Sequence, residues 1–336
     1  MARTSVLPSG KLDPRRLPAL VFGGLAVGED VVVGPSLGED AAVMRLGEGY
    51  LVAASDPITG AEGPIGRLLV HVNANDVATM GARPQWFLPV VLLPESASED
   101  DLVTIMDQMS RAAEEVGAVI VGGHTEVTPG LDRPLVSGCM LGTTDHLITS
   151  GSIRSGDALV LTKGAAIEGS CILATDRAAE VEAAVGLELA EEARGYADLI
   201  SIVPEAQVAA REKCTAMHDV TEGGVLGALH ELCSAGGVGF SVERSRIRIS
   251  EATSAICDHF GIDPLKTISS GSLLVSASPE RADAIVTGIR ALGVWADIIG
   301  RAVDIGEGAV MVDEGGTARE APFPPQDHLW TVLDGD

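Results

Sequence analysis

The sequence lacks a long hydrophobic run. Among its 336 residues, no uninterrupted apolar stretch approaches the roughly 20 residues of a membrane-spanning helix. The first segment, MARTSVLPSGKLDPRRLP, lacks the apolar stretch of a secretory signal peptide. These absences argue against a membrane-spanning or secreted protein and predict a soluble, cytoplasmic one.

Cysteine is sparse and irregularly placed. The five cysteines are odd in number, widely spaced and mostly set among apolar residues, without a CxxC pair (Cys139, Cys171, Cys214, Cys233 and Cys257). This pattern argues against a zinc site or a disulfide framework. We expect these residues to be small core side chains.

Basic residues are few: 23 lysines and arginines stand against 48 aspartates and glutamates, a formal net charge of -25. Such a field repels nucleic-acid phosphates and anionic lipids, so we expect no nucleic-acid partner and no membrane partner. Most of the surplus is typical of a solvated acidic surface. A polyphosphate ligand would need metal cations or a local basic cluster to bind here, which directs attention to aspartates in apolar surroundings.

Apolar residues make up 46% of the chain, enough for a substantial core, and the length favours two domains. The glycine- and serine-rich stretch TSGSIRSG, residues 149–156, is typical of a domain boundary. We therefore predict domains at residues 1–150 and 151–336.

Strand and helix patterns alternate irregularly along both halves. Residues 31–35, 41–46 and 50–55 read as short strands, and helical periodicity begins at Ile65 and stops near Gly81. A capping-box pattern at Ser98 and Asp101 opens a second helix that ends at Gly117. Residues 118–121 read as a buried strand leading to Gly122. In the second half, a strand ending at Asp219 passes through a glycine turn into an amphipathic helix.

The helix beginning at Ile65 carries polar residues where apolar ones are expected. Asn73 lies four residues after Leu69, and Asp76 four after Val72, so both continue the inward-facing stripe. A buried carboxylate needs a hydrogen bond, an ion pair or a metal, because an unpaired buried charge costs several kcal/mol. Two interpretations stay open: a polar residue satisfied by backbone amides or Arg83, and a metal ligand.

Five motifs carry a resemblance that covers nearly the whole chain. GEDAAV, SDPIT, NANDVATMGARP, GGHTE and HDVTEGG, in this order and spacing, resemble the aminoimidazole ribonucleotide (AIR) synthase superfamily. That superfamily includes the hydrogenase maturation protein HypE, selenophosphate synthetase and thiamine monophosphate kinase, and the chain looks most like HypE. The resemblance implies an α+β fold of two domains, an N-terminal α/β domain that dimerises through its sheet and a C-terminal α+β domain. It also implies ATP and magnesium (Mg²⁺) bound between them.

The resemblance assigns roles to four aspartates. The family's GDDAA aspartate falls on Asp40, with Glu39 before it, and its strand-end aspartate falls on Asp56. The helix carboxylate falls on Asp76, and the metal-binding aspartate of selenophosphate synthetases falls on Asp219. The resemblance thus implies that Asp40, Asp76 and Asp219 bind magnesium, which prefers such oxygen ligands, and that Asp56 and Asp76 contact the nucleotide.

The GGHTE stretch resembles a family loop that touches nucleotide phosphates. Gly122 and Gly123 would permit close approach of the backbone, and the Thr125 hydroxyl can donate to an anion. His124 is compatible with a direct chemical role or with a structural one.

SGKLDP resembles the mobile N-terminal segment of selenophosphate synthetases. Lys11 matches the lysine that this segment brings to the phosphates, although a solvated residue in a flexible arm fits as well. The position of the reactive cysteine falls on Pro8, which argues against selenophosphate synthesis.

The acceptor of the reaction is open. HypE-type proteins receive a carbamoyl group on a C-terminal cysteine, whereas this chain ends DHLWTVLDGD. We predict an ATP-dependent, magnesium-requiring enzyme that phosphorylates or activates an amide-type, carbamoyl-type or other small acceptor, acting as a homodimer. The alternatives are a non-catalytic ATP-binding scaffold in a maturation complex and a transfer like that of thiamine monophosphate kinase.

Overall fold

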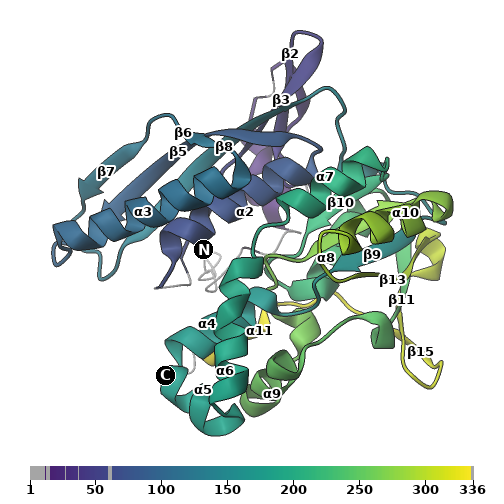
Figure 1. The fold of residues 1–336 in the computed structure, drawn as a ribbon. Helices are drawn as coiled ribbons and strands as arrows, with labels where there is room; N and C mark the ends of the chain where they lie inside the picture. The colour runs from purple at the N-terminus through teal and green to yellow at the C-terminus, as the bar shows by residue number, and fades with distance from the viewer. Residues whose placement is uncertain (1–11, 13–15, 27, 37, 60–62, 334–336) are drawn as a thin grey trace, which may run out of the picture.

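The computed structural model describes residues 12, 16–26, 28–36, 38–59 and 63–333. The described part contains two β-sheets with helices packed against them (Figure 1). The first sheet is built from residues 31–144, and the second from residues 158–320. None of the described helices is long and apolar enough to cross a lipid bilayer.

The first sheet has the strand order β1-β2-β3-β8-β5-β6, with β4 paired to β8 and β7 paired to β5. Its strands β2, β3, β8 and β5 pair in antiparallel fashion, with a register shift between Pro84 and Trp86 in the β5–β8 pair, while β6 and β7 run parallel to β5. The strands are β1 (Val31–Val33), β2 (Ala42–Leu46), β3 (Gly49–Ala54), β4 (Pro57–Ile58), β5 (Arg83–Leu93), β6 (Val119–Ile120), β7 (His124–Val127) and β8 (Leu135–Thr144). A short helix, α1 (Leu17–Leu20), precedes them.

Two helices cover one face of the first sheet: α2 (Ile65–Thr79) and α3 (Glu99–Val116) lie side by side over β5 and β8 (Figure 1). The predicted start of α2 at Ile65 is confirmed, and α3 begins with the predicted Ser98–Asp101 capping box and ends at left-handed Gly117. Almost every residue of α2 is buried, because it lies between the sheet and the second half of the chain. The α2 helix is therefore the central element of the molecule.

No helix among the described residues covers the opposite face of the first sheet. Along β5, residues alternate between buried and accessible, so that Phe87 is fully buried whereas Trp86 and Leu88 are exposed. Val119 pairs with Trp86 across the parallel β5–β6 contact, and it is exposed as well. The accessible face of an antiparallel sheet is usually polar, so these apolar residues mark an unusual surface.

The prediction that residues 118–121 form a buried strand is wrong about the burial of these residues. The strand β6 has two residues, Val119 and Ile120, and both Val119 and Val121 are exposed. A continuous apolar run is typical of a strand buried on both faces, but β6 lies at the sheet edge, where β5 is the one described strand that pairs with it. The apolar residues of this stretch therefore lie partly on the surface of the single protomer.

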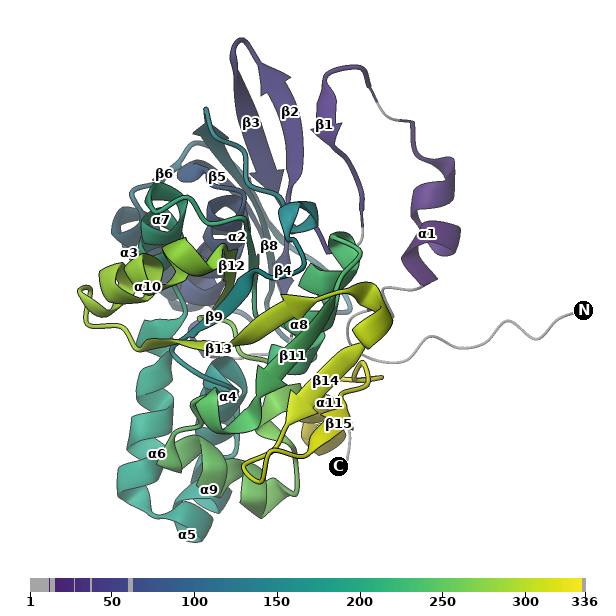
Figure 2. The same cartoon turned by 90° about the vertical axis from the view of Figure 1, so that its right-hand side faces the viewer.

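The second sheet has the order β10-β12-β9-β13-β11-β14-β15 and helices on both faces. Its strands are β9 (Ala158–Thr162), β10 (Ala216–Asp219), β11 (Gly239–Glu243), β12 (Leu273–Ala277), β13 (Ala296–Val303), β14 (Ala309–Val312) and β15 (Ala318–Glu320). The helices α7 (Val203–Arg211) and α10 (Pro279–Arg290) pack on one face, and α8 (Gly224–Ala235) on the other. Figure 2 shows this sheet below the projecting strands β2 and β3.

Four helices form a separate bundle beside the second sheet (Figure 1). They are α4 (Ile167–Asp176), α5 (Ala178–Val185), α6 (Leu187–Arg194) and α9 (Glu251–Phe260). Gly186 separates α5 from α6, and a 3-10 helix, η4 (Gly195–Leu199), follows α6. The last described element is α11 (His328–Leu333).

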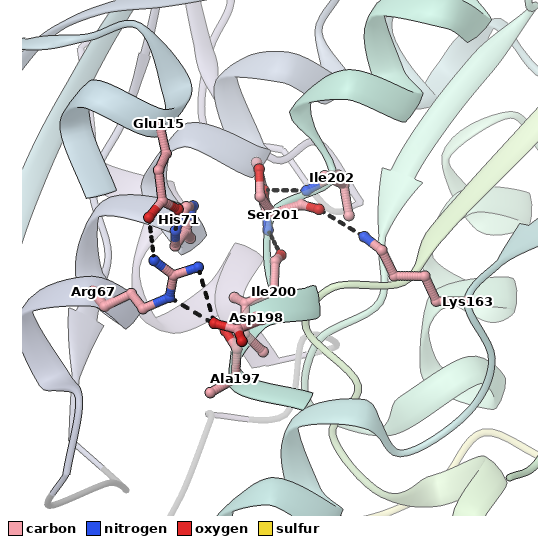
Figure 3. A network of polar contacts seen from close by, with 10 residues as sticks. Arg67, His71, Glu115, Lys163, Ala197, Asp198, Ile200, Ser201 and Ile202 are labelled. Atoms are coloured by element: carbon pink, nitrogen blue, oxygen red, sulfur yellow. Dashed lines mark hydrogen bonds and ion pairs between the residues drawn. The ribbon is translucent and has the colours of Figure 1, made fainter. Parts of the chain in front are cut away.

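A network of polar contacts joins α2 to the second half of the chain (Figure 3). Arg67 Nη1 lies 2.6 Å from Glu115 Oε1 on α3, and Arg67 Nε donates to the Ala197 carbonyl at 3.4 Å. Asn75 Nδ2 donates to the Ile200 carbonyl, while Ile202 N donates to Asn75 Oδ1, each at 2.9 Å. Buried hydrogen bonds of this kind hold the two halves in one relative position.

Candidate functional site

The candidate site lies where the end of β10 meets the α2 helix and the loop before β2. Asp219 is the last residue of β10, Asp76 lies near the C-terminal end of α2, and Asp40 precedes β2. The Asp40 side chain is 5% exposed, and the residues Asp76 and Asp219 are 4% and 3% exposed. Residues far apart in the sequence are thus brought into one buried acidic cluster.

The aspartates of this cluster repel one another electrostatically. Burial raises the pKa of Asp76 well above its ordinary value, and the charges of Asp219, Asp56 and Asp40 raise it further. Taking a carboxylate out of water disfavours its ionised form, and neighbouring carboxylates add like-charge repulsion. The cluster therefore favours a bound cation or a shared proton.

His218 completes the cluster, and the sequence motifs had not assigned it a role. Its Nδ1 lies 2.5 Å from Asp40 Oδ1, and its Nε2 lies 3.2 Å from Glu231 Oε2. Burial alone lowers the pKa of His218, but Asp40 and Glu231 raise it well above its ordinary value. The resulting imidazolium offsets part of the carboxylate charge and fixes the orientation of Asp40. A histidine directly before a motif aspartate was the only sequence signal for it.

The donor atoms fit a hard divalent cation. Ligand atoms of Asp40, His218 and Asp219 all lie within 4.8 Å of one another. The buried Asp40 Oδ2 receives no hydrogen bond from any described residue, so it retains an acceptor that a cation can use. Carboxylate oxygens are the ligands that magnesium prefers, whereas the imidazole is held by Asp40 and Glu231.

Asparagine and glutamate side chains set the positions of the acidic residues. Asn73 Oδ1 accepts from Asp56 N at 2.9 Å, and Asn73 Nδ2 donates to the Asp56 carbonyl at 3.2 Å. Glu39 accepts from the backbone amides of Ser150 and Gly151 at 3.2 and 3.1 Å. The inward-facing Asn73 is therefore a positioning residue that fixes the strand end carrying Asp56.

The glycine turn after Asp219 is required by close packing. Gly224 has φ 62°, and a Cβ at this position would lie 2.7 Å from the carbonyl oxygens of Leu265 and Thr267. Only glycine combines that backbone conformation with such close contact. The turn thus sets the direction in which the chain leaves Asp219 and enters α8.

The GGHTE loop lies away from the acidic cluster within one protomer. His124 pairs with Val90 on β5, Val90 pairs with Ser137 on β8, and Ser137 pairs with Pro57 on β4. Three strand spacings therefore separate His124 from the strand end beside Asp56, roughly 14 Å. All four residues from Gly122 to Thr125 are exposed.

Local contacts explain some of this loop without a ligand. His124 Nε2 lies 2.9 Å from Glu126 Oε2 on the strand surface. Gly123 has φ 142°, and a Cβ there would lie 2.2 Å from the Pro89 carbonyl oxygen, so the pairing of β7 with β5 itself requires glycine. The nucleotide role predicted for Gly122, Gly123 and Thr125, and the role of His124, stay predictions. Lys11 lies outside the described residues.

A cleft of about 390 Å³ opens beside the cluster between the two halves of the chain. The residues 56–59 and Val72 line it from the first half. The second half contributes Glu168, Ile172, Thr221, Glu222, Ile268, Ser270, Asp327, Leu329 and Trp330. Its volume is that of a small-molecule site. The sequence motifs assigned a role to Asp56 on its wall but to none of the acidic lining residues of the second half, although Glu222 lies within HDVTEGG.

The fold and site define a two-domain α+β protein with a carboxylate-rich cleft between its domains. The family model described as AIR synthase related protein, N-terminal domain, matches residues 38–144. The family model of the corresponding C-terminal domain matches residues 154–313. The chain belongs to the AIR synthase related family, as its motifs predicted. These two matches leave the domain boundary near residue 150 a prediction.

Among curated relatives, the carbamoyl dehydratase HypE of Azotobacter vinelandii is 31% identical over 279 residues, covering 79% of this chain and 78% of the relative. The carbamoyl dehydratase HypE of Cupriavidus necator is 29% identical over 290 residues, covering 82% and 80%. A solved structure of HypE in complex with ATP has a TM-score of 0.73, 25% identity and coverage of 97% of this chain and 99% of that one. A HypE–HypF complex structure gives a TM-score of 0.75 at 22% identity, covering 85% of this chain and 93% of that one, which supports the fold alone.

Proposed function

We propose that this protein is an ATP-dependent, magnesium-requiring enzyme that activates a small acceptor, of the amide or carbamoyl type, by phosphoryl transfer. The observation that carries the proposal is the convergence of Asp40 and Asp219, whose ligand atoms lie within 4.8 Å of one another, beside a cleft between the two halves of the chain. Asp76 lies near enough for the charges of both residues to raise its pKa. Relatives named carbamoyl dehydratase and a similar structure that contains ATP support an ATP-using enzyme.

The residues act by position and charge. Asp40, Asp76 and Asp219 would hold magnesium, which when bound supplies the positive charge that lets this acidic protein accept a triphosphate. His218 holds Asp40 in place through the contact at its Nδ1. Asn73 holds the strand end that carries Asp56, on the wall of the cleft where the nucleotide is expected.

A homodimer is part of the proposal. The uncovered face of the first sheet carries Trp86 and Leu88, 39% and 37% exposed, and Val119 beside them, 61% exposed. A second copy of this sheet would bury these residues. It would also place the exposed loop from Gly122 to Thr125 at the interface edge, where it can approach the partner protomer rather than its own acidic cluster.

A steady-state assay tests the enzymatic proposal. We expect the purified protein to hydrolyse ATP slowly in the presence of magnesium, and we expect Asp76→Asn to abolish this turnover. Asp283→Asn, an exposed position on α10, is the matched control and should retain full turnover. Nucleotide binding without turnover, alone and with candidate amides, would instead favour a non-catalytic ATP-binding scaffold. Phosphate transfer to thiamine monophosphate would favour the kinase alternative.

A further inference from the structure

The far wall of the cleft is acidic, and its carboxylates differ from those of the proposed metal cluster. Glu168 lies in the first turn of α4, Glu222 follows the strand end at Asp219, and Asp327 precedes α11. All three line the cleft, and Glu168 and Asp327 are only 7% and 5% exposed. Three separate segments of the second half thus bring acidic groups to one wall.

These carboxylates lie close enough to repel one another. Burial raises the pKa of Glu168, and the charge of Glu222 raises it further, although Ser270 donates to Glu168 and opposes the shift. Burial raises the pKa of Asp327 to about 7, against the amides of Leu329 and Gly223, and the charges of Glu222 and Glu168 add to the rise. A cation at this wall would relieve the repulsion.

Glu168 also has an unused acceptor. Its Oε2 is buried and receives no hydrogen bond from any described residue, whereas Ser270 bonds to the same carboxyl group. A buried acceptor without a donor is costly, and a ligand N–H group would satisfy it. The described residues that line the cleft include no lysine, arginine or histidine, so none of them offers a cation to these carboxylates.

The remaining walls favour an organic ion over a bare metal ion. Ile58, Val72 and Ile172 line the cleft together with Leu329 and the indole of Trp330. Trp330 Nε1 donates to Glu222 Oε1 at 3.3 Å, which fixes the ring beside the carboxylates. An aromatic face next to carboxylates is a typical binding site for ammonium groups, and apolar walls accommodate a carbon skeleton.

We propose that this wall binds an organic cation, so that the acceptor of the reaction carries an ammonium, amidinium or guanidinium group held by Glu168, Glu222 and Asp327. The identification of this ligand as the acceptor rests on the proposed function. The binding of an organic cation at this wall does not. An acceptor with a phosphate group at this wall would be repelled by the same three carboxylates.

Binding of small probes of one shape and different charge tests the inference. Benzylamine, benzyl alcohol and benzoate are titrated against the full chain by ligand-observed NMR at pH 7, without nucleotide or metal. We expect benzylamine to bind at least tenfold more tightly than benzyl alcohol, and benzoate to bind more weakly than either. Glu168→Gln should raise the Kd for benzylamine about tenfold and leave that for benzyl alcohol unchanged.

Control variants keep the test decisive. Glu188→Gln, at an exposed position on α6, should bind benzylamine as the wild type does. Glu222→Gln, at a partly exposed position, serves as a second wall variant if Glu168→Gln does not fold. Equal affinities for benzylamine and benzyl alcohol, or an unchanged Kd in both wall variants, would overturn the inference.

The metal alone provides a further arm. If magnesium chloride displaces benzylamine, and its own binding is lost in Glu168→Gln but kept in Asp219→Asn, the wall holds a metal ion and the inference is wrong. The absence of ATP turnover would not affect these titrations. Turnover without selectivity for benzylamine would overturn this inference and leave the proposed function standing.

Discussion

His218 on β10 holds Asp40 of the preceding domain, with 2.5 Å between its Nδ1 and Asp40 Oδ1. The same ring reaches Glu231 on α8 with its Nε2 at 3.2 Å. One imidazole therefore links the loop before β2, the end of the β10 strand and the α8 helix. These contacts hold together acidic residues that come from both halves of the chain.

The buried carboxyl of Asp76 should cost stability when no cation is bound. Its pKa is raised well above the ordinary value by burial and by Asp219, Asp56 and Asp40, so its ionisation is unfavourable in the folded state. We expect Asp76→Asn to raise the Tm in EDTA by about 1–3 °C, because the amide removes like-charge repulsion. Differential scanning calorimetry with Asp283→Asn as control measures this. A lower Tm for Asp76→Asn would contradict the repulsion argument.

Lys163 and Glu205 form a buried ion pair between the β9 end and α7. Lys163 Nζ lies 2.5 Å from Glu205 Oε1 and donates to the carbonyls of Ser201 and Gly271 at 2.6 and 2.8 Å. Figure 3 shows Lys163 reaching Ser201. We expect Lys163→Met to lower the free energy of unfolding by about 3–5 kcal/mol, because it leaves the Glu205 carboxylate buried without its cation.

Urea unfolding of a double-mutant cycle checks this pair. Glu205→Gln together with Lys163→Met removes both charges, and the double variant should be more stable than Lys163→Met alone. If the losses of the two single variants simply add, the pair contributes no coupling energy and the account of Lys163 is wrong.

Asp327 should make stability fall as the pH rises. Burial raises its folded-state pKa to about 7 from an ordinary value of 3.8. The folded state holds this proton where the unfolded chain has lost it, so its contribution is full below about pH 4 and is lost as the pH rises through about 7. The slope approaches at most about 1.4 kcal/mol per pH unit within that window.

Comparison with Asp327→Asn isolates this contribution. We expect the free energy of unfolding of the wild type to fall relative to that of the variant between pH 4.5 and pH 8, measured by urea denaturation at constant ionic strength. The neutral amide does not titrate, whereas both proteins share every other group. A difference between the two proteins that is independent of pH would refute the assignment.

The uncovered sheet face should hold two protomers together. Trp86→Glu places a charge beside Val119 on this face, and two such charges would meet across a symmetric interface. We expect light scattering after size-exclusion chromatography to report a dimer for the wild type and a monomer for the variant. Val103→Glu, an exposed position on α3, is the control and should remain dimeric. A wild-type protein that is monomeric at micromolar concentration would contradict the proposed dimer.

Much of the fold could be predicted because its signals are local. The capping box at Ser98, the helix start at Ile65 and the strand ending at Asp219 depend on short patterns, and the structure confirms each. The burial of residues 118–121 could not be predicted in this way. Exposure depends on how many neighbours a strand acquires, and β6 lies at the sheet edge.

The candidate site was predictable in part for the same reason. Asp76 was detectable because a polar residue on an apolar helical stripe is a local anomaly, and it is indeed buried. Glu168 and Asp327 carry no such signal, since acidic residues are common in this chain and these two become cleft residues only through long-range packing. His218 was likewise hidden, because its partners Asp40 and Glu231 are set by tertiary structure.

The central claim is that Asp40, Asp76 and Asp219 form one cation site that binds a triphosphate. Calorimetric titration of ATP with and without magnesium tests it most directly, for the wild type and for Asp219→Asn. The account predicts that ATP binds the wild type measurably only when magnesium is present, and that Asp219→Asn weakens this binding at least tenfold. Equal ATP binding without magnesium, or an unchanged Kd in Asp219→Asn, would contradict it.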